Sequence, residues 1–83
     1  MEANEFLQFD GRPLVRSGDA VIYGAPWERF YCKLKLVSEE QVLLAIIDNS
    51  IADKTKRIVV RKKSEDLGSA ILFAKNWLDM NDK

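Results

Sequence analysis

The spacing of the apolar residues changes once along the chain, close to residue 64. Before that point, short apolar runs are separated by turn residues. In the clearest run, Phe30, Cys32, Leu34 and Leu36 alternate with other side chains, a period of two that predicts a strand with one buried face. The runs predict strands at residues 6–9, 14–16, 20–23, 30–37, 42–47 and 57–63.

After that point, the apolar residues recur at three- and four-residue spacing, which predicts a helix from about residue 65 to 80. Its stripe consists of Leu67, Ala70, Ile71, Ala74, Trp77 and Leu78. Strands first and one helix last is an α+β order. We therefore expect a single domain over residues 1–83, a small antiparallel meander sheet with the C-terminal helix packed on it. The sequence does not decide whether the sheet stays open or curls into a partial barrel.

Three local features add detail to this expectation. Ser64 precedes the helical pattern and is a suitable N-cap. Pro13 cannot donate to a ladder, so the strand at 14–16 is expected at an edge or in an arm. The run 42–47 is apolar without a break, which predicts a central strand covered on both faces.

The residue types argue against catalysis, metal binding and cofactor binding. The chain has no histidine, and its only cysteine, Cys32, has the phase of the buried face. A nucleophilic cysteine needs a nearby base, and a zinc site needs several cysteine or histidine ligands. No glycine-rich phosphate loop is present. We expect no catalytic residue, no metal, no cofactor and no enzyme activity.

Charge is balanced over the whole chain but uneven along it. Residues 29–63 hold nine basic and four acidic residues, a net charge of +5, while the remainder is net −5. If the polar faces of two strands coincide, cations and an aromatic ring form a platform suited to single-stranded nucleic acid. The residues of this alternative are Lys33, Lys35, Arg57, Arg61 and Lys63, with Tyr31 or Trp27. The net charge of zero counts against it, because nucleic-acid-binding domains are usually basic overall.

The segment around residue 27 indicates a protein partner instead. Trp27, Arg29 and Tyr31 are of the residue types that are enriched at the energetic centres of interfaces. Attraction between the basic middle and the acidic remainder would also suit a homodimer. The primary expectation is therefore a non-enzymatic interaction or accessory module that binds another protein or itself. The alternative is a weak nucleic-acid-binding domain.

Two stretches carry a resemblance to known proteins. Residues 11–18 (GRPLVRSG), followed by Ile22-Tyr23-Gly24, and residues 57–64 (RIVVRKKS) resemble segments of a family of small bacterial proteins without an assigned role. The resemblance implies a bacterial cytosolic domain and transfers no functional residue. The acidic residues at 2 and 5, the lone thiol and the lack of a long apolar run likewise predict a cytoplasmic protein without membrane contact.

Overall fold

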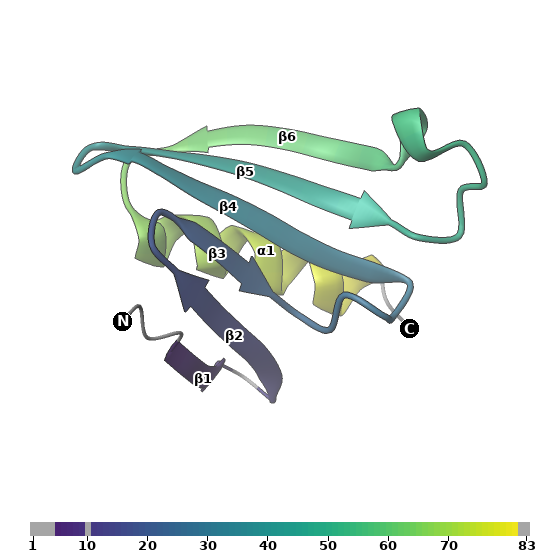
Figure 1. Ribbon diagram of the computed structural model, residues 1–83, viewed down its shortest axis with the longest axis horizontal. Helices are drawn as coiled ribbons and strands as arrows, with labels where there is room; N and C mark the ends of the chain where they lie inside the picture. The colour runs from purple at the N-terminus through teal and green to yellow at the C-terminus, as the bar shows by residue number, and fades with distance from the viewer. Residues whose placement is uncertain (1–4, 10, 82–83) are drawn as a thin grey trace.

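The computed structural model describes residues 5–9 and 11–81 (Figure 1). Six strands form one antiparallel sheet in sequence order, and a single C-terminal helix packs on it. The elements are β1 (Glu5–Phe9), β2 (Arg12–Ser17), β3 (Ala20–Tyr23), β4 (Phe30–Ser38), β5 (Gln41–Asp48), β6 (Ile58–Ser64) and α1 (Leu67–Asn81). The α+β prediction is confirmed, and the sheet is open rather than closed into a barrel, with β1 and β6 at its edges.

Tight turns allow each strand to pair with the next. Gly18 has a φ of 62° in the turn between β2 and β3, where Ser17 pairs with Ala20. Gly24 has a φ of 95° after β3, and a Cβ there would lie 3.5 Å from the Tyr31 Cα. Both positions favour glycine, because other residues are strained at positive φ. The loop between β5 and β6 contains one 3₁₀ turn, Lys54–Lys56.

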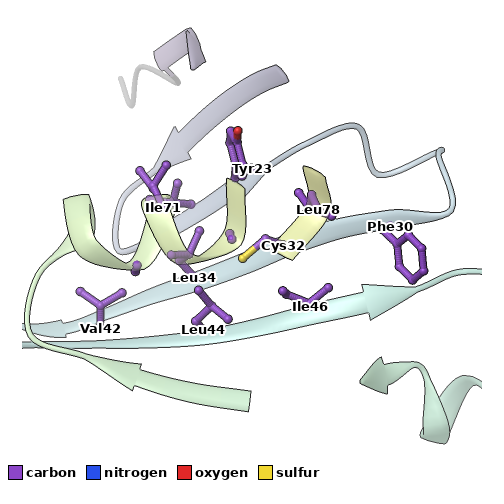
Figure 2. Close-up of a cluster of buried hydrophobic side chains, with 12 residues drawn as sticks. Tyr23, Phe30, Cys32, Leu34, Val42, Leu44, Ile46, Ile71 and Leu78 are labelled. Carbon is purple, nitrogen blue, oxygen red and sulfur yellow. The ribbon is translucent and has the colours of Figure 1, made fainter. Parts of the chain in front are cut away.

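The core lies between α1 and one face of the sheet, which we call the helix face (Figure 2). Alternation along the strands directs Cys32 and Leu34 of β4, and Leu44 and Ile46 of β5, toward the helix. The helix contributes a buried stripe of Ala70, Ile71, Ala74 and Leu78. Cys32 is fully buried, as its phase predicts, and burial raises the pKa of its thiol to about 12. The thiol is therefore neutral and shielded at physiological pH.

The helix starts two residues later than expected because a different side chain caps it. Asp66 accepts a hydrogen bond from the Ser69 amide through Oδ1, at 2.7 Å, which is the geometry of an N-cap. The prediction of Ser64 as the cap is wrong. Ser64 is the last residue of β6, where it pairs with Val42 and is buried.

The strand that contains Pro13 is interior, which corrects the expectation of an edge strand. β2 lies between β1 and β3. The last pair of β2 with β3 is Leu14 with Tyr23, and the Pro13 carbonyl accepts from the Gly24 amide at 2.8 Å, just beyond it. The missing proline donor thus falls at the end of the β2–β3 ladder, just beyond its last pair.

The apolar strand β5 is next to an edge and is fully covered only on its helix face, whereas the sequence predicts cover on both faces. Val42, Leu44 and Ile46 are buried under α1. On the other face, Ile47 at the end of the strand is buried, but in the middle of the strand Leu43 is 37% exposed and Ala45 is partly exposed. The chain has a single helix in its described part, and that helix lies on one side of the sheet (Figure 1).

Candidate interaction surface

The face of the sheet opposite α1 is here called the open face. Lys62 marks the helix face, since its Nζ lies 4.9 Å from the centre of the Phe73 ring of α1. Its neighbours Arg61 and Lys63 therefore point the other way. The same alternation places Lys33 and Lys35 of β4 on the open face, and all four of these cations are exposed.

The pairing register arranges the open-face side chains in two rows across the sheet. In one row Lys33 pairs with Ala45, which pairs with Arg61. In the next row Lys35 pairs with Leu43, which pairs with Lys63. The four cations thus form two rims, one on β4 and one on β6, with the apolar side chains of β5 between them. We call this arrangement the trough.

The trough belongs to a hollow of about 810 Å³ over the middle of β3 to β6. Its apolar surface includes Leu43 and Ala45 in the trough and Ile22 of β3, on the outer side of the Lys33 rim. Of the described residues that line it, Asp19 alone is acidic. Among the residues that the structure describes, no carboxylate forms an ion pair with Lys33, Lys35, Arg61 or Lys63. Within the described part of the chain, the hollow therefore combines an apolar strip with an excess of positive charge.

Arg57 is separated from the other four cations of the predicted basic surface. The pairing of β5 and β6 shifts between Ile46–Val60 and Ile47–Ile58, so Val59 is an extra residue in β6. A bulge of this kind reverses the alternation before it. Arg57 lies ahead of the strand, and its Nε donates to the Ile51 carbonyl at 2.6 Å. The prediction that Arg57 belongs to the strand at 57–63 and to the same basic platform as Arg61 is therefore wrong.

The three residues expected to bind a protein partner differ in their exposure and their contacts. Trp27 lies in the loop between β3 and β4 and is 81% exposed. Tyr31 is half-buried on the open face, where it pairs with Ile47. Arg29 is engaged within the molecule, since it lies over the Phe30 ring at 4.6 Å and bonds to Asp48.

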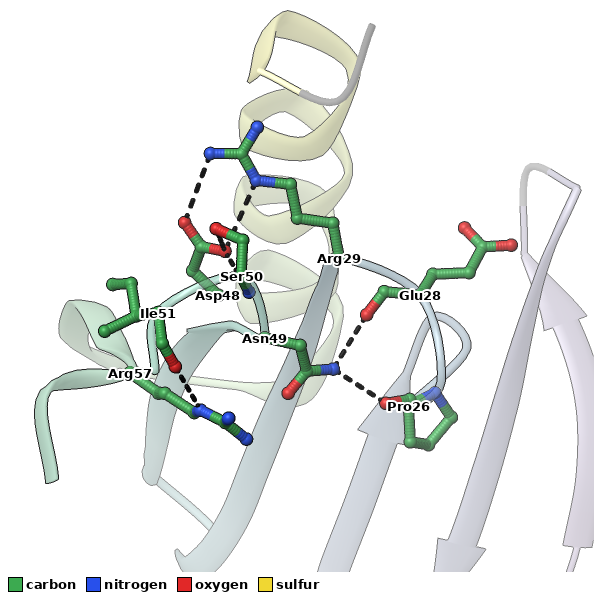
Figure 3. Close-up of polar contacts among 8 residues, drawn as sticks. All are labelled: Pro26, Glu28, Arg29, Asp48, Asn49, Ser50, Ile51 and Arg57. Carbon is green, nitrogen blue, oxygen red and sulfur yellow. Dashed lines mark hydrogen bonds and ion pairs between the residues drawn. The ribbon is translucent and has the colours of Figure 1, made fainter. Parts of the chain in front are cut away.

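Asp48 and Asn49 hold the end of β5 to the loop that carries Trp27 (Figure 3). The Asp48 carboxylate accepts from the Ser50 hydroxyl at 2.6 Å and from Arg29 at 3.3 and 3.4 Å. These bonds lower the pKa of Asp48, and the hydrogen bond from the Ser50 hydroxyl contributes most to the shift. Asn49 Nδ2 donates to the carbonyls of Pro26 and Glu28 at 2.8 and 2.7 Å. The link between the two segments is not expected from the sequence, because Arg29, Pro26 and Glu28 lie about twenty residues from Asp48 and Asn49.

The acidic side chains of the described residues do not gather into a metal-binding group. No cluster of three or more histidine, cysteine, aspartate or glutamate side chains occurs among them. Glu39 and Glu40 are exposed at the turn between β4 and β5, and Asp66 is the helix cap. In the described part of the chain, no helix combines the length and the hydropathy needed to cross a membrane.

Comparisons with protein-family models, with curated proteins and with solved structures found no match. The resemblance to small bacterial proteins therefore stays a prediction. The function proposed below rests on the geometry and charge of the open face.

Proposed function

We propose that this protein is a non-enzymatic interaction module whose open face binds an acidic, partly apolar segment of another protein. The observation that supports the proposal is the trough, in which Leu43 and Ala45 lie between two pairs of cations that have no ion-pair partner among the described residues. Exposed apolar side chains inside a charged border are typical of protein-binding sites. In such a complex, burial of the apolar strip and pairing of the cations with carboxylates would both stabilise the bound state.

The apolar content of the trough favours a protein segment over nucleic acid. Single strands bind through rings that stack on the bases, as well as through cations. Among the described residues, the apolar part of the lining of the hollow is aliphatic, and neither Tyr31 nor Trp27 belongs to the lining. The chain also has a net charge of zero, whereas a nucleic-acid-binding domain usually carries a basic excess.

Charge also argues against a homodimer formed through this face. An isologous dimer brings the same patch of each copy together. Two open faces in contact would oppose Lys33 and Lys35 to the cations of the partner, and Asp19 is the sole acid to offset them among the lining residues that the structure describes. Like charges placed together are unfavourable. Self-association through another surface stays a prediction, which light scattering at micromolar concentration tests.

A binding experiment with site-directed variants tests the proposed function. The probe is a fluorescently labelled peptide of about fourteen residues made of glutamate, leucine and alanine. Its anisotropy is measured with increasing protein at about 50 and 200 mM salt, since exposed charges are screened more strongly at the higher concentration. We expect salt-sensitive binding that is lost in the double variant Lys33→Glu/Lys35→Glu.

The matched control is Lys54→Glu/Lys56→Glu, which changes the total charge equally. These two lysines are exposed in the 3₁₀ turn and do not line the hollow. The control variant should bind like the wild type, and thermal melts should show that both variants fold. Equal loss in both variants would mean that only total charge matters, and no binding by the wild type would contradict the proposal. Binding of a single-stranded oligonucleotide instead of the peptide, lost in the same site variant, would assign the face to nucleic acid.

A further inference from the structure

We infer that the segment bound in the trough is an acidic amphipathic α-helix aligned with β5, an inference that rests on the proposed function. Its apolar stripe would face Leu43 and Ala45. Its carboxylates would lie on both flanks, against Lys33 and Lys35 on one side and against Arg61 and Lys63 on the other. Two features favour a helix over an extended segment, namely the backbone groups available on a sheet face and the width of the trough. The spacing of the cations is compatible with a helix.

The backbone of a segment on the open face has no ladder to join. The amides and carbonyls of β4, β5 and β6 point along the plane of the sheet, and β5 is paired on both sides. An extended segment laid on the face would leave its own backbone groups without partners where water is excluded, which is costly. A helix satisfies these groups internally. Extended segments are instead expected at the sheet edges, β1 and β6.

The width of the trough agrees with the diameter of a helix. The two rims are separated by two strand spacings, because β5 lies between β4 and β6. At about 4.8 Å per spacing, the backbones that carry the rims lie about 9.6 Å apart. A helix with its side chains is about 10–12 Å across. Lysine and arginine stems can lean along its sides while their charged ends reach its flanks.

The spacing of the cations along each rim fits carboxylates on successive helical turns. Lys33 and Lys35 are two residues apart on one strand, which corresponds to about 6.8 Å. Side chains four residues apart on a helix have Cβ atoms about 5–6 Å apart. One helix flank with acids at i and i+4 therefore matches one rim, and the opposite flank matches Arg61 and Lys63. An extended chain with acids at i and i+2 has a similar spacing, so the backbone and the width decide between the two conformations.

Three peptides of about fourteen residues test the conformation of the bound segment. The first places leucines at i, i+3, i+4 and i+7 and glutamates on both flanks. The second has the same residues in an order without helical amphipathicity. The third is the first with a proline at its centre, which breaks the helix. Their dissociation constants are measured by anisotropy with the wild type, with Lys33→Glu/Lys35→Glu and with the control Lys54→Glu/Lys56→Glu.

We expect the first peptide to bind at least tenfold more tightly than the other two, and to gain helical circular dichroism on binding. This preference should disappear in Lys33→Glu/Lys35→Glu and persist in the control variant. Equal binding of all three peptides would overturn the helical conformation and leave the proposed function intact. Binding of none of them would overturn both.

Discussion

At the level of single residues, the structure assigns Asp66 as the N-cap of α1, and a substitution tests this assignment. Its Oδ1 accepts the Ser69 amide at 2.7 Å, so Asp66→Ala removes the cap of α1. We expect a loss of about 1 kcal/mol in the free energy of unfolding, measured by urea denaturation. Asp66→Asn is the matched control, because asparagine caps about equally well. An Asp66→Ala variant as stable as the wild type, together with a destabilised Ser64→Ala variant, would contradict the assignment of Asp66 as the cap.

Asp48 gives the fold a dependence on pH whose direction follows from its contacts. Its pKa lies below the ordinary value of 3.8, since the Ser50 hydroxyl and Arg29 favour the ionised form. Ionised Asp48 therefore stabilises the fold above the ordinary value, and this contribution is lost as the pH falls through the lowered one. We expect Asp48→Asn to be less stable than the wild type at about pH 7 and closer to it at about pH 2.5. A difference in urea midpoints that is equal at both pH values would contradict this account.

At the scale of the elements, α1 depends on the side chains that it buries. Leu78 is 1% exposed, whereas Leu72 on the same helix is 52% exposed. We expect Leu78→Ala to lower the free energy of unfolding by about 2–5 kcal/mol, and Leu72→Ala to have little effect. Thermal or urea denaturation of the two variants measures the contrast. Similar losses in both would mean that α1 packs on the sheet through a different stripe.

Periodicity predicted the elements well because each pattern reflects a local geometry. The six strands and the helix occur where the apolar runs predict them, and Cys32 faces the core as its phase requires. The wrong predictions concern residues whose setting depends on residues that are close in space but distant in the sequence. Both Ser64 and Asp66 can cap a helix, and pairing with Val42 assigns Ser64 to β6. The bulge at Val59 leaves no mark on the sequence pattern, so the pattern does not show that Arg57 lies outside β6 and away from Arg61.

The sequence predicts the basic side chains of the candidate site but not the apolar strip between them. Lys33, Lys35, Arg61 and Lys63 share one face as the strand alternation suggests. The unbroken apolar run predicts that Leu43 and Ala45 are buried, because such a run usually has cover on both sides. A chain with one predicted helix can cover only one face of its sheet with it. This mismatch is the feature of the sequence that could have identified the trough.

In the molecule as a whole, one side of the sheet holds the core that stabilises the fold, and the other side is exposed and can bind a partner. The helix face holds the buried core, and the open face holds exposed cations around an apolar strip. Substitutions on the two sides should therefore have separable effects. Changes at Lys33 and Lys35 should alter binding with little effect on stability, because both side chains are exposed and unpaired among the described residues.

Mapping the contact surface by NMR tests the central claim most directly. ¹⁵N-labelled protein is titrated with the unlabelled helical peptide, and the shifts of the backbone amides are followed. We predict the largest changes at Lys33, Leu43, Ala45 and Arg61, with small changes at Lys54 and Lys56 in the loop before β6. Changes centred on Trp27 or on the edge strand β1, with the trough unaffected, would contradict the assignment of the open face as the binding surface.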